Sequence, residues 1–264
     1  MLFYLFPLNP PLKSILVVGQ KQKTFLKNKK ALVSGASGKL GQSICKSLAE
    51  EGIHLALHYR SNFSTVKELK DFAEGKKVKA LTFQADLSTQ NSVEELIGSA
   101  QEGLGGIDFL INCVGDFLYK PLLELEVEEF RQIIDSNLTN VFALCKTALP
   151  HLRKSACGRI INIGYANATE LTAKPSILPY HIAKLGLVLL TKSLAQKEKE
   201  TAAKKSVLIN CISPGICEDS EFWPQMKPLA NSLVKKKDLN QLILFLLGSE
   251  TLTGCNFEIG GDWK

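Results

Sequence analysis

The sequence contains no C-x-x-C pair, and its four histidines show no metal-ligand spacing. Its seven cysteines are an odd number and are scattered along the chain. We therefore expect neither a metal site nor a disulfide framework. Reduced cysteines that are mostly buried as small hydrophobes are typical of a cytoplasmic protein, and this is the location that we predict.

The apolar segment at the start of the sequence lacks the length and continuity that we expect of a membrane span. Residues 1–18 are apolar but are interrupted by Pro7, Pro10 and Pro11. A spanning helix takes about 20 apolar residues, and a signal peptide needs positive charge before the apolar run and a small-residue cleavage site after it. We predict no stable membrane span. We interpret residues 1–26 as a poorly ordered extension, with a peripheral membrane or partner contact as the alternative.

Charge of one sign is not gathered into a block. The formal net charge of +6 is spread over 264 residues, so it favours anionic small molecules as partners and argues against nucleic acid. No internal repeat, low-complexity tract or linker divides the chain. With 45% hydrophobic and 22% charged residues, we expect one soluble globular domain over residues 27–264.

Short apolar runs alternate with segments of helical spacing. We predict strands at 31–34, 53–59, 78–84, 107–113, 159–163, 207–212 and 255–259, and helices at 40–51, 65–74, 92–104, 126–149, 180–196 and 239–247. Ser88 or Asn91 is the expected cap of the third helix, and Pro150 the expected end of the fourth. This alternation predicts an α/β fold, a single doubly wound domain with a parallel sheet of about seven strands and helices on both faces.

A glycine-rich turn joins the first predicted strand to the first predicted helix. The segment from Ser34 to Gly41 reads S-G-A-S-G-K-L-G. Glycines let the backbone approach a phosphate closely, and a helix N-terminus offers free N–H groups and a positive dipole end. We therefore predict a dinucleotide phosphate site at Gly35, Ser37, Lys39 and Leu40.

The end of the second predicted strand is basic rather than acidic. A site for NAD would place a carboxylate there to hold the ribose 2′-hydroxyl, whereas this chain has Arg60 and Ser61. A phosphate monoester carries about −1.5 to −2 charges near neutral pH. Arg60 and Lys39 would balance that negative charge and Ser61 would donate a hydrogen bond to it, so the sequence favours NADP(H).

Tyr180 and Lys184 are four residues apart in a predicted helix, and such residues share a face. A free phenol has a pKa near 10. A fixed ammonium beside it favours the phenolate, or makes the phenol a better acid in the reducing direction. This pair predicts general acid–base chemistry.

In this order and spacing, the motifs resemble the short-chain dehydrogenase/reductase family, from about Lys29 to Trp263. Two departures lie in the glycine motif, where Ser34 replaces the usual Thr and Lys39 the middle Gly. The further matches are Asp86-Leu87, the segment from Asn112 to Gly115, Asn137, Tyr180 with Lys184, and Asn210 with Pro214-Gly215.

The resemblance implies a Rossmann fold and a set of roles. Asp86 and Leu87 would contact the adenine, Asn112 and Gly115 would belong to the cofactor site, and Pro214 and Gly215 would close over the nicotinamide. Tyr180 would be the proton donor, and Lys184 would hold the nicotinamide ribose. Asn137 would anchor a water that passes protons towards Lys184, and the subunits would form a homotetramer or homodimer.

The family's usual serine before the catalytic tyrosine is missing. Counting forward from the fifth strand puts Tyr165 in its place, and counting back from Tyr180 puts Asn167 there. Either side chain can donate a hydrogen bond to a carbonyl oxygen. We favour Tyr165.

The leading hypothesis is an NADPH-dependent reductase of a small-molecule or carrier-bound carbonyl substrate, similar to 3-oxoacyl-acyl-carrier-protein reductases. A second hypothesis is a pteridine reductase-like enzyme, because those enzymes resemble this chain in the basic turn and the missing serine. The third is a dinucleotide-binding protein of the same fold that has lost efficient catalysis.

Overall fold

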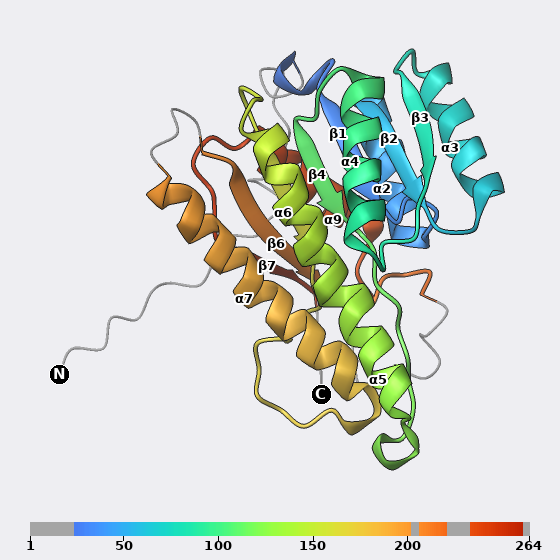
Figure 1. Ribbon diagram of the computed structural model, residues 1–264, viewed down its shortest axis with the longest axis vertical. Coiled ribbons are helices and arrows are strands. Elements are labelled where there is room, and N and C mark those ends of the chain that lie inside the picture. The colour runs from blue at the N-terminus through green and yellow to red at the C-terminus, as the bar shows by residue number, and fades with distance from the viewer. Residues whose placement is uncertain (1–23, 202–205, 221–232, 261–264) are drawn as a thin grey trace.

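The computed structural model describes residues 24–201, 206–220 and 233–260 (Figure 1). Its centre is a seven-stranded sheet with the order β3-β2-β1-β4-β5-β6-β7. All six pairings are parallel. The strands are β1 (Lys30–Ser34), β2 (His54–Tyr59), β3 (Ala80–Gln84), β4 (Phe109–Asn112), β5 (Arg159–Ile163), β6 (Leu208–Pro214) and β7 (Asn256–Ile259).

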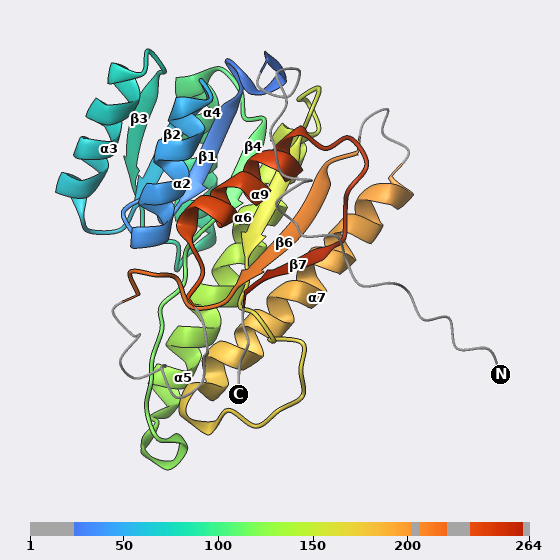
Figure 2. The ribbon, with the colours of Figure 1, turned by 180° about the vertical axis from the view of Figure 1, so that it is seen from behind.

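Helices cover both faces of the sheet, as the alternation in the sequence predicted. One face carries α2 (Lys39–Glu50), α3 (Phe63–Gly75) and α9 (Lys236–Gly248), and Figure 2 shows this layer in front. The other face carries α4 (Gln90–Leu104), α6 (Asn140–Leu152) and α7 (Leu178–Glu200). The predicted fold class is confirmed.

The central strands are buried on both faces, which explains their nearly continuous apolar sequence. In β1, Ala31 and Val33 pack into the core beneath α2, whereas Leu32 packs into the opposite core beneath α4 and α6. Leu26, which we had assigned to the extension 1–26, is completely buried in the first of these cores. Residues 1–23 of that extension lie outside the described residues.

Two predicted helix boundaries were wrong. Thr89, rather than Ser88 or Asn91, caps α4, because its Oγ1 accepts the Ser92 N–H at 3.2 Å. Pro150 does not end the fourth helix but lies inside its last turn, and the helix continues to Leu152.

The segment predicted as one long helix from residue 126 is in fact three pieces. It consists of α5 (Val127–Ile134), a π-helical turn (Asp135–Thr139) and α6. A π-helical turn holds one extra residue per turn and is often found at functional sites. Here it contains Asn137, whose side chain lies against the loop that follows β4.

One stretch of the described residues, Pro175–Glu200, is long and apolar enough to cross a membrane by length and composition alone. This criterion is weak evidence, because a core helix of a soluble protein also meets it. In this protein 44% of the apolar 18-residue stretch within Pro175–Glu200 is buried inside the fold, where α7 packs against β6.

Candidate active site

A cleft of about 320 Å³ opens where the parallel strands end. From β1 the chain builds the sheet towards β2 and β3 on one side and towards β4 on the other, so this is the topological switch point at which such folds bind ligands. The lining comes from the glycine turn, the loops after β4, β5 and β6, and the start of α7 and α9. It includes Gly38, Lys39, Leu40, Gly115, Phe117, Tyr165, Tyr180, Pro214, Gly215, Cys217 and Lys236.

Tyr180 lines this cleft, and Lys184 is buried beside it. The Lys184 Nζ atom is 5.5 Å from the centre of the Tyr180 ring and donates a hydrogen bond to the Ile163 carbonyl oxygen at 2.9 Å. Lys184 is only 4% exposed, and this burial lowers its pKa to about 8. The backbone carbonyl therefore holds a cation that the surrounding apolar groups disfavour.

Burial also determines the direction in which the pKa of Tyr180 shifts. It raises the pKa of the phenol above its ordinary value, and a neighbouring thiol at Cys217 adds to the effect. We had expected the ammonium of Lys184 to pull this pKa down. With burial as the larger effect, the phenol stays protonated at neutral pH, which is the form of a proton donor.

Two aromatic rings hold the Tyr180 ring in place. Phe117 packs edge-on against it with ring centres 5.0 Å apart, and Tyr165 packs edge-on at 5.6 Å. Tyr165 is 5% exposed and lines the cleft, while Asn167 does not line it and has a left-handed φ of 60°. Of the two positions that sequence counting left open, the cleft contains Tyr165.

Asn137 is positioned by the π-helical turn and by Gly115. Its Nδ2 donates to the carbonyl oxygens of Asp116 at 2.7 Å and Ile133 at 3.0 Å. Its Oδ1 is buried and has no hydrogen-bond partner among the described residues. Gly115 has φ +146°, and a Cβ there would clash with that oxygen. The amide is thus fixed with one acceptor left open for a hydrogen bond.

The glycine turn provides the features that a bound phosphate needs. Gly38 is the N-cap of α2 and offers no side-chain cap, so the first N–H groups of the helix stay open towards the cleft. A Cβ at Gly41 would clash with the Gly35 carbonyl oxygen, which explains why the turn requires glycine there. The lysines that line the cleft add positive charge, so the residues present fit a dinucleotide.

His58 has a structural role that the sequence did not suggest. It lies two residues before Arg60, near the end of β2. Its Nδ1 accepts the Gly35 N–H at 3.2 Å, and its Nε2 lies 3.1 Å from the Ala85 carbonyl oxygen, to which it donates. Burial lowers its pKa. A neutral imidazole therefore ties the glycine turn to the end of β3.

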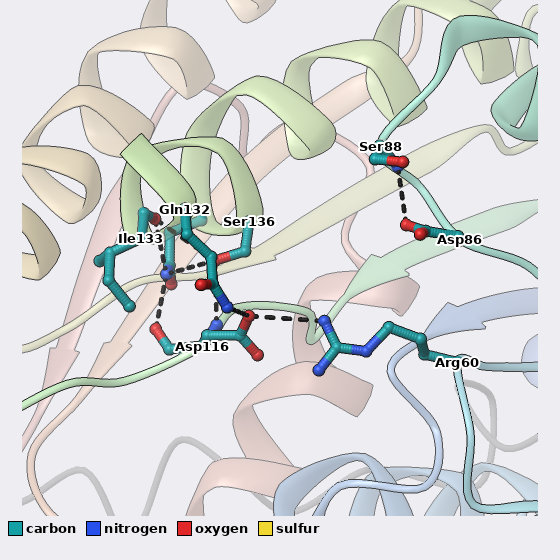
Figure 3. Close-up of polar contacts among 8 residues, drawn as sticks. Arg60, Asp86, Ser88, Asp116, Gln132, Ile133 and Ser136 are labelled. Atoms are coloured by element: carbon teal, nitrogen blue, oxygen red, sulfur yellow. Dashed lines mark hydrogen bonds and ion pairs between the residues drawn. The ribbon is translucent and has the colours of Figure 1, made fainter. Parts of the chain in front are cut away.

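The basic residues expected to share one phosphate lie apart. Lys39 lines the main cleft and donates to the Asp219 carbonyl oxygen at 3.1 Å. Arg60 instead lines a second cavity of about 560 Å³ together with Asp86, and it pairs with Asp116 at 3.5 Å (Figure 3). Ser61 is exposed beside Arg60.

Lys236 is a cleft residue that sequence reasoning missed. It begins α9, forms an ion pair with Asp219 and donates to the Lys39 carbonyl oxygen at 3.2 Å. It is almost 200 residues from the glycine turn in sequence, and no motif marks it. Only the close packing of α9 against α2 brings it to the cleft.

Several residues of the sequence motifs serve the sheet through their side chains. Asn112 is 1% exposed and donates to Asn162 Oδ1 at 2.8 Å, and Asn162 in turn donates to Thr191 Oγ1 at 2.9 Å. Ser34 Oγ donates to Asn112 Oδ1 at 3.2 Å. We call Ser34, Asn112, Asn162 and Thr191 the polar seam. Asn210 is similarly engaged, by the Leu252 carbonyl oxygen and the Cys255 N–H.

Comparison with known proteins identifies the family. The model of the short chain dehydrogenase family matches residues 29–228. The chain belongs to this family. The resemblance that the sequence motifs indicated is therefore confirmed.

Relatives within the short chain dehydrogenase family are informative about chemistry. A 3beta-hydroxysteroid dehydrogenase 1 of Eggerthella lenta is 32% identical over 72% of this chain and 71% of its own. A 3-oxoacyl-acyl-carrier-protein reductase of Staphylococcus aureus is 28% identical over 84% of this chain and 86% of its own. A dehydrogenase of Burkholderia cenocepacia, solved with bound NADP, superimposes with a TM-score of 0.80 at 25% identity, covering 90% of this chain and 94% of its own.

As a short chain dehydrogenase, the protein is an oxidoreductase that acts on an alcohol or ketone and uses a nicotinamide dinucleotide. The cleft accounts for both halves of this activity. Open N–H groups and lysines lie on its glycine-turn side, and Tyr180 lies on its α7 side with Lys184 buried beside it.

Proposed function

We propose that the protein is an NADP(H)-dependent reductase of a carbonyl substrate. The observation that carries the proposal is the placement of the Tyr180 phenol in the cleft, with the Lys184 ammonium buried beside it one helical turn further along α7 and the glycine turn on another wall of the cleft. An acid beside a dinucleotide site is what reduction of a carbonyl requires.

Charge supports NADP(H) over NAD(H). The residue that follows β2 is Arg60, at the position where an NAD-binding chain would have a carboxylate to hold a ribose hydroxyl. The solved relative with bound NADP supports the same choice. We assign the diphosphate of the cofactor to Gly35, Ser37, Lys39 and Leu40, and we add Lys236 beside them. The 2′-phosphate is assigned to Arg60 with Ser61, and the adenine to Asp86 and Leu87. The ribose and nicotinamide side is assigned to Asn112, Gly115, Pro214 and Gly215.

When bound, NADPH supplies a hydride to the carbonyl carbon. Tyr180 donates its phenolic proton to the carbonyl oxygen as the C=O bond becomes an alcohol. Lys184 binds the nicotinamide ribose and stabilises the phenolate that remains. Tyr165, whose pKa is also raised by burial, stays protonated and donates a hydrogen bond that holds the carbonyl oxygen. The open Oδ1 of Asn137 anchors a water through which Tyr180 is reprotonated by way of Lys184.

A 3-oxoacyl group on an acyl carrier protein is the substrate that we favour. The support is the similarity to 3-oxoacyl-acyl-carrier-protein reductases and the net charge of +6, which suits an acidic carrier. A pteridine reductase-like activity is the alternative, supported by Lys39, Arg60 and the missing serine. A dinucleotide-binding role without catalysis is the other alternative.

We place the protein in the cytoplasm as a homodimer or homotetramer. Exposed apolar side chains on the long helices support an assembly, namely Phe142 at 44%, Ile182 at 41% and Leu189 at 57% exposure. Light scattering coupled to size-exclusion chromatography measures the assembly directly, and a monomer would contradict it.

The activity is tested by following NADPH oxidation with an acetoacetyl thioester and with a dihydropterin, for the wild type beside Tyr180→Phe. We expect the substitution to lower turnover by about 10²- to 10⁴-fold while NADPH still binds, because it removes only the phenolic hydroxyl that donates the proton. Faster oxidation of the dihydropterin would select the alternative substrate. NADPH binding without turnover on a broad carbonyl panel would overturn the catalytic proposal.

A further inference from the structure

An ion pair joins the loop after β2 to the loop after β4, beside the second cavity that Arg60 lines. Arg60 follows the end of β2, and Asp116 comes four residues after the end of β4. These two strands flank β1, so the pair crosses the end of β1 from which the glycine turn starts. The two side chains point towards one another, and Arg60 Nη1 lies 3.5 Å from Asp116 Oδ2 (Figure 3).

Asp116 is the fixed partner of this pair. Its N–H donates to Ser136 Oγ at 3.2 Å, and its carbonyl oxygen accepts from Asn137 Nδ2 at 2.7 Å. Its Oδ2 also accepts from Gln132 Nε2 at 3.3 Å. The side chain of Arg60, by contrast, is 64% exposed. If the pair separates, the arginine is the partner that moves.

A 2′-phosphate would compete with this carboxylate for the arginine. The phosphate carries about −1.5 to −2 charges and can accept two parallel hydrogen bonds from a guanidinium, whereas Asp116 makes a single long contact. Because Asp116 stays in place, it also repels a phosphate bound to Arg60. A ribose 2′-hydroxyl has no charge and meets neither effect.

We infer that Asp116 sets the ratio of NADPH to NADH affinity, by competing with the 2′-phosphate for Arg60. The inference deepens the proposed function and rests on its assignment of Arg60 to that phosphate. Asp116 touches the cofactor site through Arg60 and is a specificity-determining residue rather than a catalytic one. Its presence weakens NADPH binding and leaves NADH binding unchanged.

The test is the substitution Asp116→Asn, which keeps the shape, both backbone hydrogen bonds and an acceptor for Gln132. We expect the dissociation constant for NADPH, measured by fluorescence titration, to fall about two- to fivefold, the range expected for loss of an exposed ion pair. The dissociation constant for NADH should not change. In an Arg60→Gln background the same substitution should give a clearly smaller gain.

A matched control removes one negative charge elsewhere. Glu128→Gln breaks the exposed pair of Glu128 with Arg131 on α5, and neither residue lines the cleft. It should leave both dissociation constants unchanged. Equal changes for NADPH and NADH in Asp116→Asn, no change for either, or the same gain with and without Arg60 would overturn the inference.

Failure of the proposed function looks different. In that case the wild type binds NADH as tightly as NADPH, and Arg60→Gln does not weaken NADPH binding. This result would overturn both the assignment of Arg60 to the 2′-phosphate and the inference about Asp116. If the wild type prefers NADPH and loses the preference in Arg60→Gln, the proposed cofactor stands. The Asp116→Asn measurement then judges the inference alone.

Discussion

Lys184 lies in surroundings that disfavour its charge, and this has a measurable consequence for stability. The pKa of the buried ammonium is lowered to about 8, from the ordinary value of 10.5 that it regains on unfolding. Between these two values the unfolded chain binds more protons than the folded one, so stability rises with pH. Below pH 8 both states are protonated, and the cost of burying the charge is fully present.

We therefore predict that the wild type gains stability relative to Lys184→Met between pH 8 and 10. Methionine has a similar length and no charge, so the other titrating groups cancel in the difference. Urea denaturation at pH 7, 8, 9 and 10 measures it. A difference that stays constant across this range would mean that the folded protein does not lower the Lys184 pKa.

Tyr165 provides the second prediction at the scale of single residues. If its hydroxyl holds the carbonyl oxygen, Tyr165→Phe should lower kcat about tenfold, because a hydrogen bond of roughly 1.4 kcal/mol is lost in the transition state. NADPH affinity should not change. Steady-state kinetics and a binding titration check both parts.

Tyr119→Phe is the control for that experiment, since Tyr119 is 42% exposed and does not line the cleft. An unchanged kcat in Tyr165→Phe would mean that Tyr165 only lines the cleft and donates no hydrogen bond to the substrate. A large gain in rate from Tyr165→Ser would show that the tyrosine hinders a reaction that the usual serine would support.

Among the secondary-structure elements, the polar seam joins β1, β4, β5 and α7 through fully buried groups. Thr191 Oγ1 accepts from Asn162 and donates to the Leu187 carbonyl oxygen at 2.8 Å. We predict that Thr191→Val lowers the free energy of unfolding by about 1–3 kcal/mol, because the Asn162 amide is left buried without its acceptor. Chemical denaturation monitored by circular dichroism measures the loss.

Ser193 provides the comparison two residues further along α7. Its hydroxyl makes the same bond to the carbonyl four residues back, at 2.8 Å to Leu189, but it is exposed and supports no amide. Ser193→Ala should change stability by less than about 0.5 kcal/mol, as exposed substitutions commonly do. Equal losses at the two positions would show that the buried amide costs nothing.

The elements also show how far the sequence could predict this structure. All seven strands were found, because each is a short run, mostly apolar, that is bounded by turn residues. The π-helical turn was not, since a single turn of five residues is too short to show a periodicity of its own. The order of strands and helices can thus be predicted from local sequence patterns, whereas irregular features such as the π-helical turn cannot.

The same limit applies to the candidate site. Tyr180 with Lys184 and the glycine turn were predicted because each is a short motif with its own chemistry. The partners of the charged residues were not, because Asp116 for Arg60 and Asp219 for Lys236 depend on which loops meet at the edge of the sheet.

At the scale of the whole molecule, cofactor binding should stabilise the fold. A ligand that binds only the folded state adds about 2.7 kcal/mol at 100 times its dissociation constant, which raises the Tm of a chain of this size by roughly 5–10 °C. We predict this rise with NADPH in a thermal shift assay, and a smaller rise with NADH at the same concentration. Equal shifts with the two cofactors would contradict the assignment of Arg60 to the 2′-phosphate.

Because all seven strands run in the same direction, the two ends of the sheet are separate surfaces. The turns at the starting end, at 51–53, 76–79, 105–108 and 155–158, contribute nothing to the lining of the cleft. Lys76 and Lys77 stand exposed among them. Tethering the protein to a solid support through these lysines would leave the reacting end facing solution, so the immobilised enzyme should keep its access to cofactor and substrate.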